Sequence, residues 1–291
     1  MKKKKQIQHI YEAVFLKLKI FFIKFLDFHT TRFFGKLFGL FLFYIVPVRK
    51  KTAIKNIRNS LKVSISEAKK IAKKAYMNFF KGIFEIINLE KLNKVRISKI
   101  AEFNNFFLLE DAIKKGRGVI FCTIHLGGFY FIGYALKRMG ITVNYILKKQ
   151  RNLKVFEILK KRFLDIGIKY TVLQKVPKNI FRALNSGDVV IFQCDQDAGK
   201  TGVFVDFFGR PASTPQGPAL FHKSLKAPII LAYCVYENKK YKINCKLYDN
   251  PEKKVEEIVF DYTKFFEDVI RKYPDQYFWL HKRWHTKKCQ N

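Results

Sequence analysis

The sequence predicts an α/β fold with a mixed, largely parallel sheet flanked by helices, and an N-terminal helical segment that associates with a membrane. Three observations predict this. Beyond about residue 95, short β-branched runs alternate with stretches of helical periodicity. Glycines stand just past several of the helical stretches. The first 48 residues interleave lysines with aromatic and aliphatic side chains. We therefore expect a membrane-associated helical anchor over residues 1–48 and one α/β domain over residues 49–291.

The N-terminal segment opens with the basic run Lys2–Lys5, and an apolar stretch broken by three lysines, Ile7–Phe28, follows. Its longest uninterrupted apolar piece, Leu37–Val48, is 12 residues long, whereas a membrane span needs roughly 20. No small-residue cleavage site follows, so a signal peptide is not expected. Lysine stems lie along apolar surface while their ammonium groups reach lipid headgroups. The pattern favours a helix lying in an anionic leaflet, or a short anchor, over a helical pair packed on the core.

The elements of the domain follow in order. A capping box at Ser64-x-x-Glu67 predicts a long helix over Ala68–Leu92. Strands are then predicted at Val119–Ile124, Val143–Leu147, Tyr170–Leu173, Val189–Cys194 and Ile229–Tyr236. The helices between them are Asn105–Lys115, Phe129–Met139, Leu153–Ile166, Pro177–Asn185 and Pro215–Ser224. A strand at Tyr241–Leu247 and a helix at Phe265–Lys272 close the domain.

The charge is strongly positive. The 57 Lys and Arg exceed the 23 Asp and Glu by 34, which attracts nucleic acid, anionic membranes or acidic partners. An AT-rich genome also produces such a composition. The lysines are spread over the whole length and no nucleic-acid-binding motif is present, so no nucleic-acid partner is expected. The five cysteines form no CxxC pair, which favours reduced core thiols, and we expect neither a metal nor a cofactor.

Two predicted strand ends carry polar residues. In open α/β sheets, ligands bind beyond the carboxyl ends of the strands. The first such strand runs into His125, followed by Leu126-Gly-Gly and a helix. A neutral imidazole there can take a proton from a hydroxyl group near neutral pH. The alternative is a histidine that only hydrogen-bonds within a strand-end turn.

The second strand end carries Asp195 and Asp197, before a loop rich in Gly and Pro that contains Arg210, Ser213 and Thr214. This composition indicates a polar cleft. Arg210 and the amides that open the following helix suit a phosphate or an oxyanion. The alternative is that both aspartates only cap turns or helices.

These residues carry a family resemblance. The chain resembles the bacterial lipid A late acyltransferases, within the lysophospholipid acyltransferase superfamily, from about Arg49 to Trp284. The matching blocks are Arg49…Asn56, Glu85, Gly116-Arg-Gly-Val with His125-Leu-Gly-Gly, Asp195-Gln-Asp with Phe207-Phe-Gly-Arg-Pro-Ala212, and Tyr273-Pro-Asp-Gln-Tyr-Phe-Trp-Leu-His-Lys-Arg-Trp284. Five blocks in the right order are far more specific than any one motif.

Two positions depart from the family pattern. Tyr130 stands where the family has the Asp or Glu that orients the histidine; a phenol can accept a hydrogen bond from the ring but carries no charge at pH 7. Ile146 stands where the family has an arginine, and Lys148, Lys149 or Arg151 are candidates to supply that charge to a substrate. A catalytically impaired homologue, or an inactive membrane scaffold, is therefore an alternative.

The resemblance implies transfer of a fatty acyl group from acyl carrier protein, or from acyl-CoA, to a hydroxyl of a lipid A precursor at the cytoplasmic face of the inner membrane. His125 would be the general base, with Asp195 or Asp197 replacing the missing carboxylate and Arg210 or helix-start amides stabilising the oxyanion. The implied partners are an acidic carrier-protein thioester, an anionic lipid acceptor and the membrane surface. Another glycolipid or a lysophospholipid is the alternative acceptor.

Overall fold

The computed structural model describes residues 2–147, 152–172 and 176–287. Within these residues the main sheet has seven strands in the order β1-β9-β8-β2-β5-β3-β4. Neighbouring strands are parallel except for the antiparallel pair β8 and β9, so the predicted mixed, largely parallel sheet is confirmed. The strands are β1 Ala101–Asn104, β2 Val119–Thr123, β3 Val143–Leu147, β4 Lys169–Val172, β5 Val189–Gln193, β8 Ile229–Glu237 and β9 Lys240–Tyr248.

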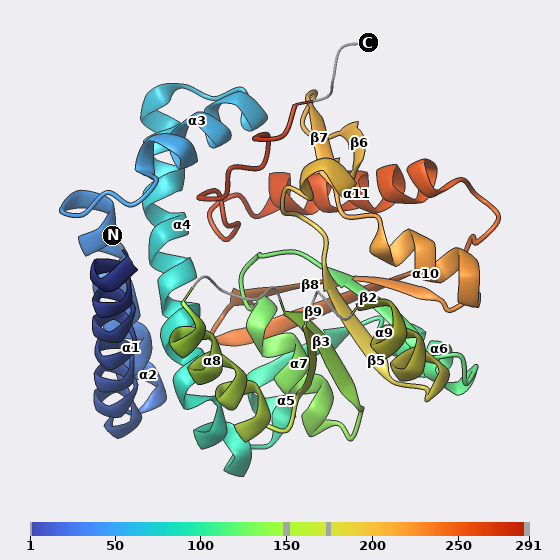
Figure 1. Ribbon diagram of the computed structural model, residues 1–291, viewed down its shortest axis with the longest axis horizontal. Helices are drawn as coiled ribbons and strands as arrows, with labels where there is room; N and C mark the ends of the chain where they lie inside the picture. Colours follow the sequence, from blue (N-terminus) through green and yellow to red (C-terminus); the bar gives the residue numbers. More distant parts are fainter. Residues whose placement is uncertain (1, 148–151, 173–175, 288–291) are drawn as a thin grey trace.

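Helices cover both faces of this sheet (Figure 1). The α-helices are α1 Lys2–Phe25, α2 Phe28–Tyr44, α3 Lys50–Leu61, α4 Ile65–Glu85, α5 Ile97–Ile100, α6 Phe107–Lys114, α7 Phe129–Arg138, α8 Leu153–Asp165, α9 Val176–Asn185, α10 Gly217–Leu225 and α11 Val255–Lys272. The 3₁₀ segments are η1 Ile86–Lys94 and η3 Gly199–Thr201, and β6 Val203–Asp206 pairs with β7 Pro211–Thr214 in a separate antiparallel hairpin.

The core is divided by the sheet. Residues of β2 alternate between its two faces: Ile120 and Cys122 join the cluster under α9, α10 and α11, whereas Val119 and Phe121 join the cluster under α6 and α7. All five residues of β2 are buried. A strand covered on both faces reads as a continuous apolar run, which is why β2 and β5 were predictable from sequence.

The predicted elements from β2 to β9 agree with the structure to within two residues at each end. Four features differ. The predicted helix Ala68–Leu92 becomes 3₁₀ from Ile86, and β1 and the β6–β7 hairpin lie where no strand was predicted. Helix α11 begins ten residues before the predicted start, because its first turns already bury Ile258, Val259 and Tyr262 against the sheet.

The N-terminal helices lie against the domain. Helix α2 packs along α4, and α1 contacts α8 and η1 (Figure 1). Gly35 and Gly39 permit the close approach, since a Cβ at either would lie 2.7 Å from the backbone of α4. Asp27 caps α2 by accepting hydrogen bonds from the amides of His29 and Thr30. The chain thus forms the helical pair on the core that was the less favoured alternative.

This pair nonetheless exposes many large apolar side chains. Its exposed large side chains include Phe21, Phe22, Phe25, Phe33, Phe34, Leu37 and Phe41. None of the helices in the described residues is both long and apolar enough to cross a bilayer.

Candidate active site

The site lies where β2 and β5 end. These strands are parallel neighbours in which Thr123 is opposite Gln193, so the residues two positions further along, His125 and Asp195, emerge side by side. The imidazole Nδ1 of His125 lies 2.8 Å from Oδ1 of Asp195. The backbone N–H of His125 donates to the second carboxylate oxygen at 3.2 Å. Both oxygens of one carboxylate therefore fix one histidine, by its ring and by its backbone.

Asp195 is buried among groups that favour its charged form. Burial raises its pKa, but the charge of His125 and the two hydrogen bonds from that residue, with a further contribution from His281, bring the pKa of Asp195 below its usual range. The Tyr277 hydroxyl also hydrogen-bonds this carboxylate; burial and the Asp195 charge raise the pKa of Tyr277 well above the ordinary value, so it stays a neutral donor. Asp195 is thus an anion that acts on His125 near neutral pH.

The other ring nitrogen, Nε2, is not bonded to Asp195. His125 has only 14% of its side chain exposed. Its ring lies 4.9 Å from that of Phe129 and 6.0 Å from that of Phe278, which stacks on a third ring, Phe79, at 4.3 Å. The Gln196 side-chain nitrogen lies 3.4 Å from Nε2, too far for a strong hydrogen bond. With Nδ1 held by Asp195, Nε2 can accept a proton from a substrate beside an apolar wall.

Tyr130, the candidate catalytic residue at the position of the family's carboxylate, does not take part in this pair. Its hydroxyl donates to Glu85, and burial raises its pKa. A Cβ at Gly82 would clash with the phenol ring, so this glycine makes the room that Tyr130 occupies. The tyrosine that replaces the family's carboxylate is therefore part of a different network.

That network is centred on Glu85, at the end of α4 and fully buried. Its carboxylate pairs with Arg32 of α2 and accepts hydrogen bonds from Tyr130 and from Tyr241 of β9, the latter at 2.5 Å. The Arg32 guanidinium also lies 3.5 Å from the centre of the Tyr236 ring. The buried Glu85 carboxylate, through its ion pair with Arg32 and its hydrogen bond from Tyr130, links α2 to α7, which begins four residues after His125.

Most of the predicted site residues in the segment after β5 form hydrogen bonds with other parts of the protein. Asp197 accepts hydrogen bonds from the amide and hydroxyl groups of Thr286, at 3.2 and 2.8 Å, so it holds the C-terminal segment. Arg210 donates to the Ser60 hydroxyl at 3.0 Å and stacks on Trp284 at 3.5 Å. Of the two candidate aspartates, only Asp195 contacts His125.

Ser213 and Thr214, which the sequence predicts to bind substrate, make hydrogen bonds inside the protein. Both residues are fully buried. The Ser213 hydroxyl donates to the Gly199 carbonyl at 2.6 Å, and that of Thr214 donates to the Ala212 carbonyl at 3.0 Å while accepting from Arg283. Their hydroxyl groups thus tie β7 to η3 and to Arg283. Lys148 and Arg151, also predicted to bind substrate, lie outside the described residues.

Several residues of the site were not singled out individually from the sequence. Phe278 donates its backbone N–H to the His125 carbonyl at 3.0 Å, and Asn56 donates to the carbonyls of Trp279 and His281, at 2.9 Å each. These residues belong to the sequence blocks that carry the family resemblance, so the sequence did indicate that they lie in or near the site. No sequence pattern indicated the role of Arg32, because its partner Glu85 is 53 positions away in the chain.

The sequence is similar to those of known acyltransferases. The sequence model of the bacterial lipid A biosynthesis acyltransferases matches residues 1–286. A phosphatidylinositol mannoside acyltransferase of Mycobacterium tuberculosis (strain H37Rv) is 25% identical over 175 residues, covering 57% of this chain and 53% of the relative. A lipid A biosynthesis acyltransferase of Haemophilus influenzae is 26% identical over 216 residues, covering 71% and 66%. The matches thus span about half to two thirds of these relatives.

Proposed function

This chain belongs to the family of bacterial lipid A biosynthesis acyltransferases, and on that premise we propose that it transfers a fatty acyl group to a hydroxyl group of a glycolipid. One observation carries the proposal: the 2.8 Å contact between His125 Nδ1 and the buried carboxylate of Asp195 at the carboxyl ends of adjacent parallel strands. Such a pair is the general-base half of an acyl-transfer site.

The chemistry needs few groups. The acceptor hydroxyl binds at Nε2 of His125, which takes its proton as the oxygen attacks the thioester carbonyl. The tetrahedral intermediate then collapses, the carbon–sulfur bond breaks, and the imidazolium returns the proton to the leaving thiolate. Asp195 holds the ring with Nδ1 protonated and stabilises the imidazolium that forms. The aromatic rings of Phe129 and Phe278 keep water from competing with the acceptor.

The departure at Tyr130 is compatible with this activity. An imidazole without a carboxylate partner would make a catalytically impaired protein. Here Asp195 provides that partner from the segment after β5, and Tyr130 instead hydrogen-bonds Glu85. The arrangement therefore supports an active enzyme over an inactive scaffold.

The donor, the acceptor and the location are parts of the proposal. The donor is an acyl carrier protein or acyl-CoA thioester, and the net charge of +34 favours approach of an acidic carrier. The acceptor is a lipid A precursor, as the name of the Haemophilus relative suggests. The mannoside in the name of the Mycobacterium relative makes another glycolipid the second candidate. The apolar outer surface of α1 and α2 would rest on the cytoplasmic face of the inner membrane.

The test is product analysis by mass spectrometry. The purified protein is incubated with acyl carrier protein and CoA thioesters, and with a lipid A precursor, a phosphatidylinositol mannoside and a lysophospholipid in parallel. We expect one acylated glycolipid, and at least a thousandfold slower formation with His125→Ala. A folded His125→Ala variant that keeps the full rate, or a wild type that acylates only the lysophospholipid, would contradict the proposal.

A further inference from the structure

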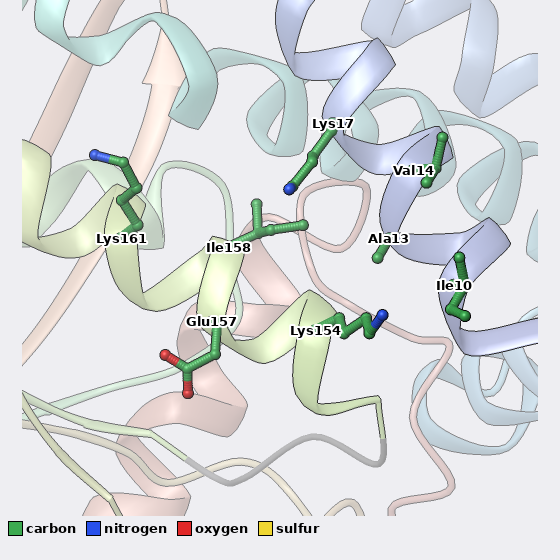
Figure 2. A pocket seen from close by; sticks show the side chains of 8 residues that line it. All are labelled: Ile10, Ala13, Val14, Lys17, Lys154, Glu157, Ile158 and Lys161. Carbon is green, nitrogen blue, oxygen red and sulfur yellow. The ribbon is translucent and has the colours of Figure 1, made fainter. Parts of the chain in front are cut away.

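A groove separates α1 from α8 on the flank of the domain. Its volume is about 490 Å³, within the range of pockets that hold small molecules. Its lining residues are Ile10, Ala13, Val14 and Lys17 of α1 and Lys154, Glu157, Ile158 and Lys161 of α8 (Figure 2). The apolar members form a floor, and Lys17 and Lys154 stand along its sides.

Two cations share this space without an anion between them. Figure 2 shows Lys17 extending from α1 toward α8, and Lys154 extending from α8 toward α1. Within the described residues neither ammonium group has a carboxylate partner. Glu157 points away from the groove and pairs with Lys160 at 2.7 Å, and Lys161 also points away, pairing with Asp165 at 2.9 Å.

A second carboxylate near this interface, Glu12, is already used. It accepts hydrogen bonds from the side-chain amides of Asn152 at 2.8 Å and of Gln8 at 2.9 Å, and these bonds lower its pKa. Two unpaired like charges facing one gap repel each other and attract an anion. The groove therefore combines an apolar floor with a local excess of positive charge.

We propose that this groove binds one anionic phospholipid, with its phosphate between Lys17 and Lys154 and an acyl chain on the floor formed by Ile10, Val14 and Ile158. The occupant follows from the neighbouring surface. Further along α1, Phe21, Phe22 and Phe25 are exposed by 57, 65 and 73%. A lysine-bearing helix with such a face lies at a lipid interface, where the available anionic amphiphile is a phospholipid. This binding is separate from acyl transfer and does not involve His125.

The test uses lipid below its micellar concentration, so that binding of one molecule is separated from adsorption to a membrane. Dihexanoyl phosphatidylglycerol is titrated into the full-length protein by calorimetry, with dihexanoyl phosphatidylcholine as the neutral comparison. The test variant is Lys17→Glu with Lys154→Glu. The control, Lys74→Glu with Lys178→Glu, changes the net charge equally at exposed lysines outside the groove. Val14→Gln removes part of the floor at an already exposed position.

We expect saturable binding of about one phosphatidylglycerol. The groove variant should bind phosphatidylglycerol at least tenfold more weakly, because two charge contacts of ordinary surface strength supply about that factor. The control variant should bind like the wild type. Val14→Gln should weaken binding with the charges intact. Equal affinity of the groove and control variants, equal affinity for phosphatidylcholine, or binding to anionic vesicles without binding of monomeric lipid would each overturn the proposal. A failed acyl-transfer assay would leave these titrations unaffected.

Discussion

Replacing Asp195 by Asn tests whether the carboxylate sets the protonation of the catalytic ring. The substitution keeps the shape, and the amide oxygen can still accept the His125 backbone N–H, now made at 3.2 Å. The amide NH₂ then faces Nδ1, which is 2.8 Å from the carboxylate in the wild type. That contact favours the tautomer protonated at Nε2, which cannot accept the substrate proton. Loss of the carboxylate in a comparable triad lowers turnover about 10⁴-fold, so we expect a fall of roughly 10³- to 10⁴-fold, or about 4 to 5.5 kcal/mol.

The assay is the initial rate of acyl transfer at saturating donor and acceptor. Asp197→Asn is the matched control, because it removes the same charge from the same loop but its carboxylate contacts Thr286 and Gly199 instead of His125. We expect the control to lose less than tenfold. Folding of both variants is checked by urea denaturation. If Asp195→Asn is folded and transfers within tenfold of the wild type, the carboxylate does not position the base and the reasoning fails.

Three further predictions concern the buried polar groups. Glu85→Gln leaves the Arg32 guanidinium without its carboxylate and should lower the free energy of unfolding by roughly 3 kcal/mol in urea titrations. A decrease of less than about 1 kcal/mol would contradict a structural role for this ion pair. Tyr130→Phe removes one hydrogen bond to Glu85, which should lower the free energy of unfolding by about 1 kcal/mol and change the transfer rate less than about threefold. Tyr130→Glu places a second carboxylate beside Glu85 and should not raise the transfer rate. Faster transfer by the Glu variant would show that His125 lacks a sufficient partner. Burial lowers the pKa of His281 to about 4, so below pH 6.5 the unfolded chain binds a proton that the folded protein excludes. The free energy of unfolding should therefore fall by roughly 2–3 kcal/mol as the pH drops from 6.5 to 4. His281→Gln should flatten this part of the dependence of the free energy of unfolding on pH.

Much of the sheet was predictable because its strands are buried on both faces. The continuous apolar runs of β2 and β5, each followed by polar residues, located both strand ends. The β6–β7 hairpin was missed because Val203–Asp206 is short and its partner begins with Pro211, which reads as a loop. The first half of α11 was missed although its buried Ile258, Val259 and Tyr262 have helical spacing, so that signal was present.

The site was predictable in part. That His125 and an aspartate share one sheet edge followed from parallel pairing, but the choice of Asp195 over Asp197 needed the register, in which Thr123 is opposite Gln193. The loop hydroxyls of Ser213 and Thr214 resemble ligand donors in sequence, yet they face inward. No local pattern indicates which buried donors a loop residue will meet, because those donors come from distant parts of the chain, as Arg283 does for Thr214.

The most direct test of the central claim is the tautomer of the His125 ring, read from ¹⁵N chemical shifts of histidine-labelled protein and assigned with His125→Ala. The account predicts that the neutral ring carries its proton on Nδ1, hydrogen-bonded to Asp195, and that Asp195→Asn moves the proton to Nε2. A neutral ring protonated on Nε2 in the wild type, or shifts that Asp195→Asn leaves unchanged, would contradict the assignment of His125 as a base held by Asp195.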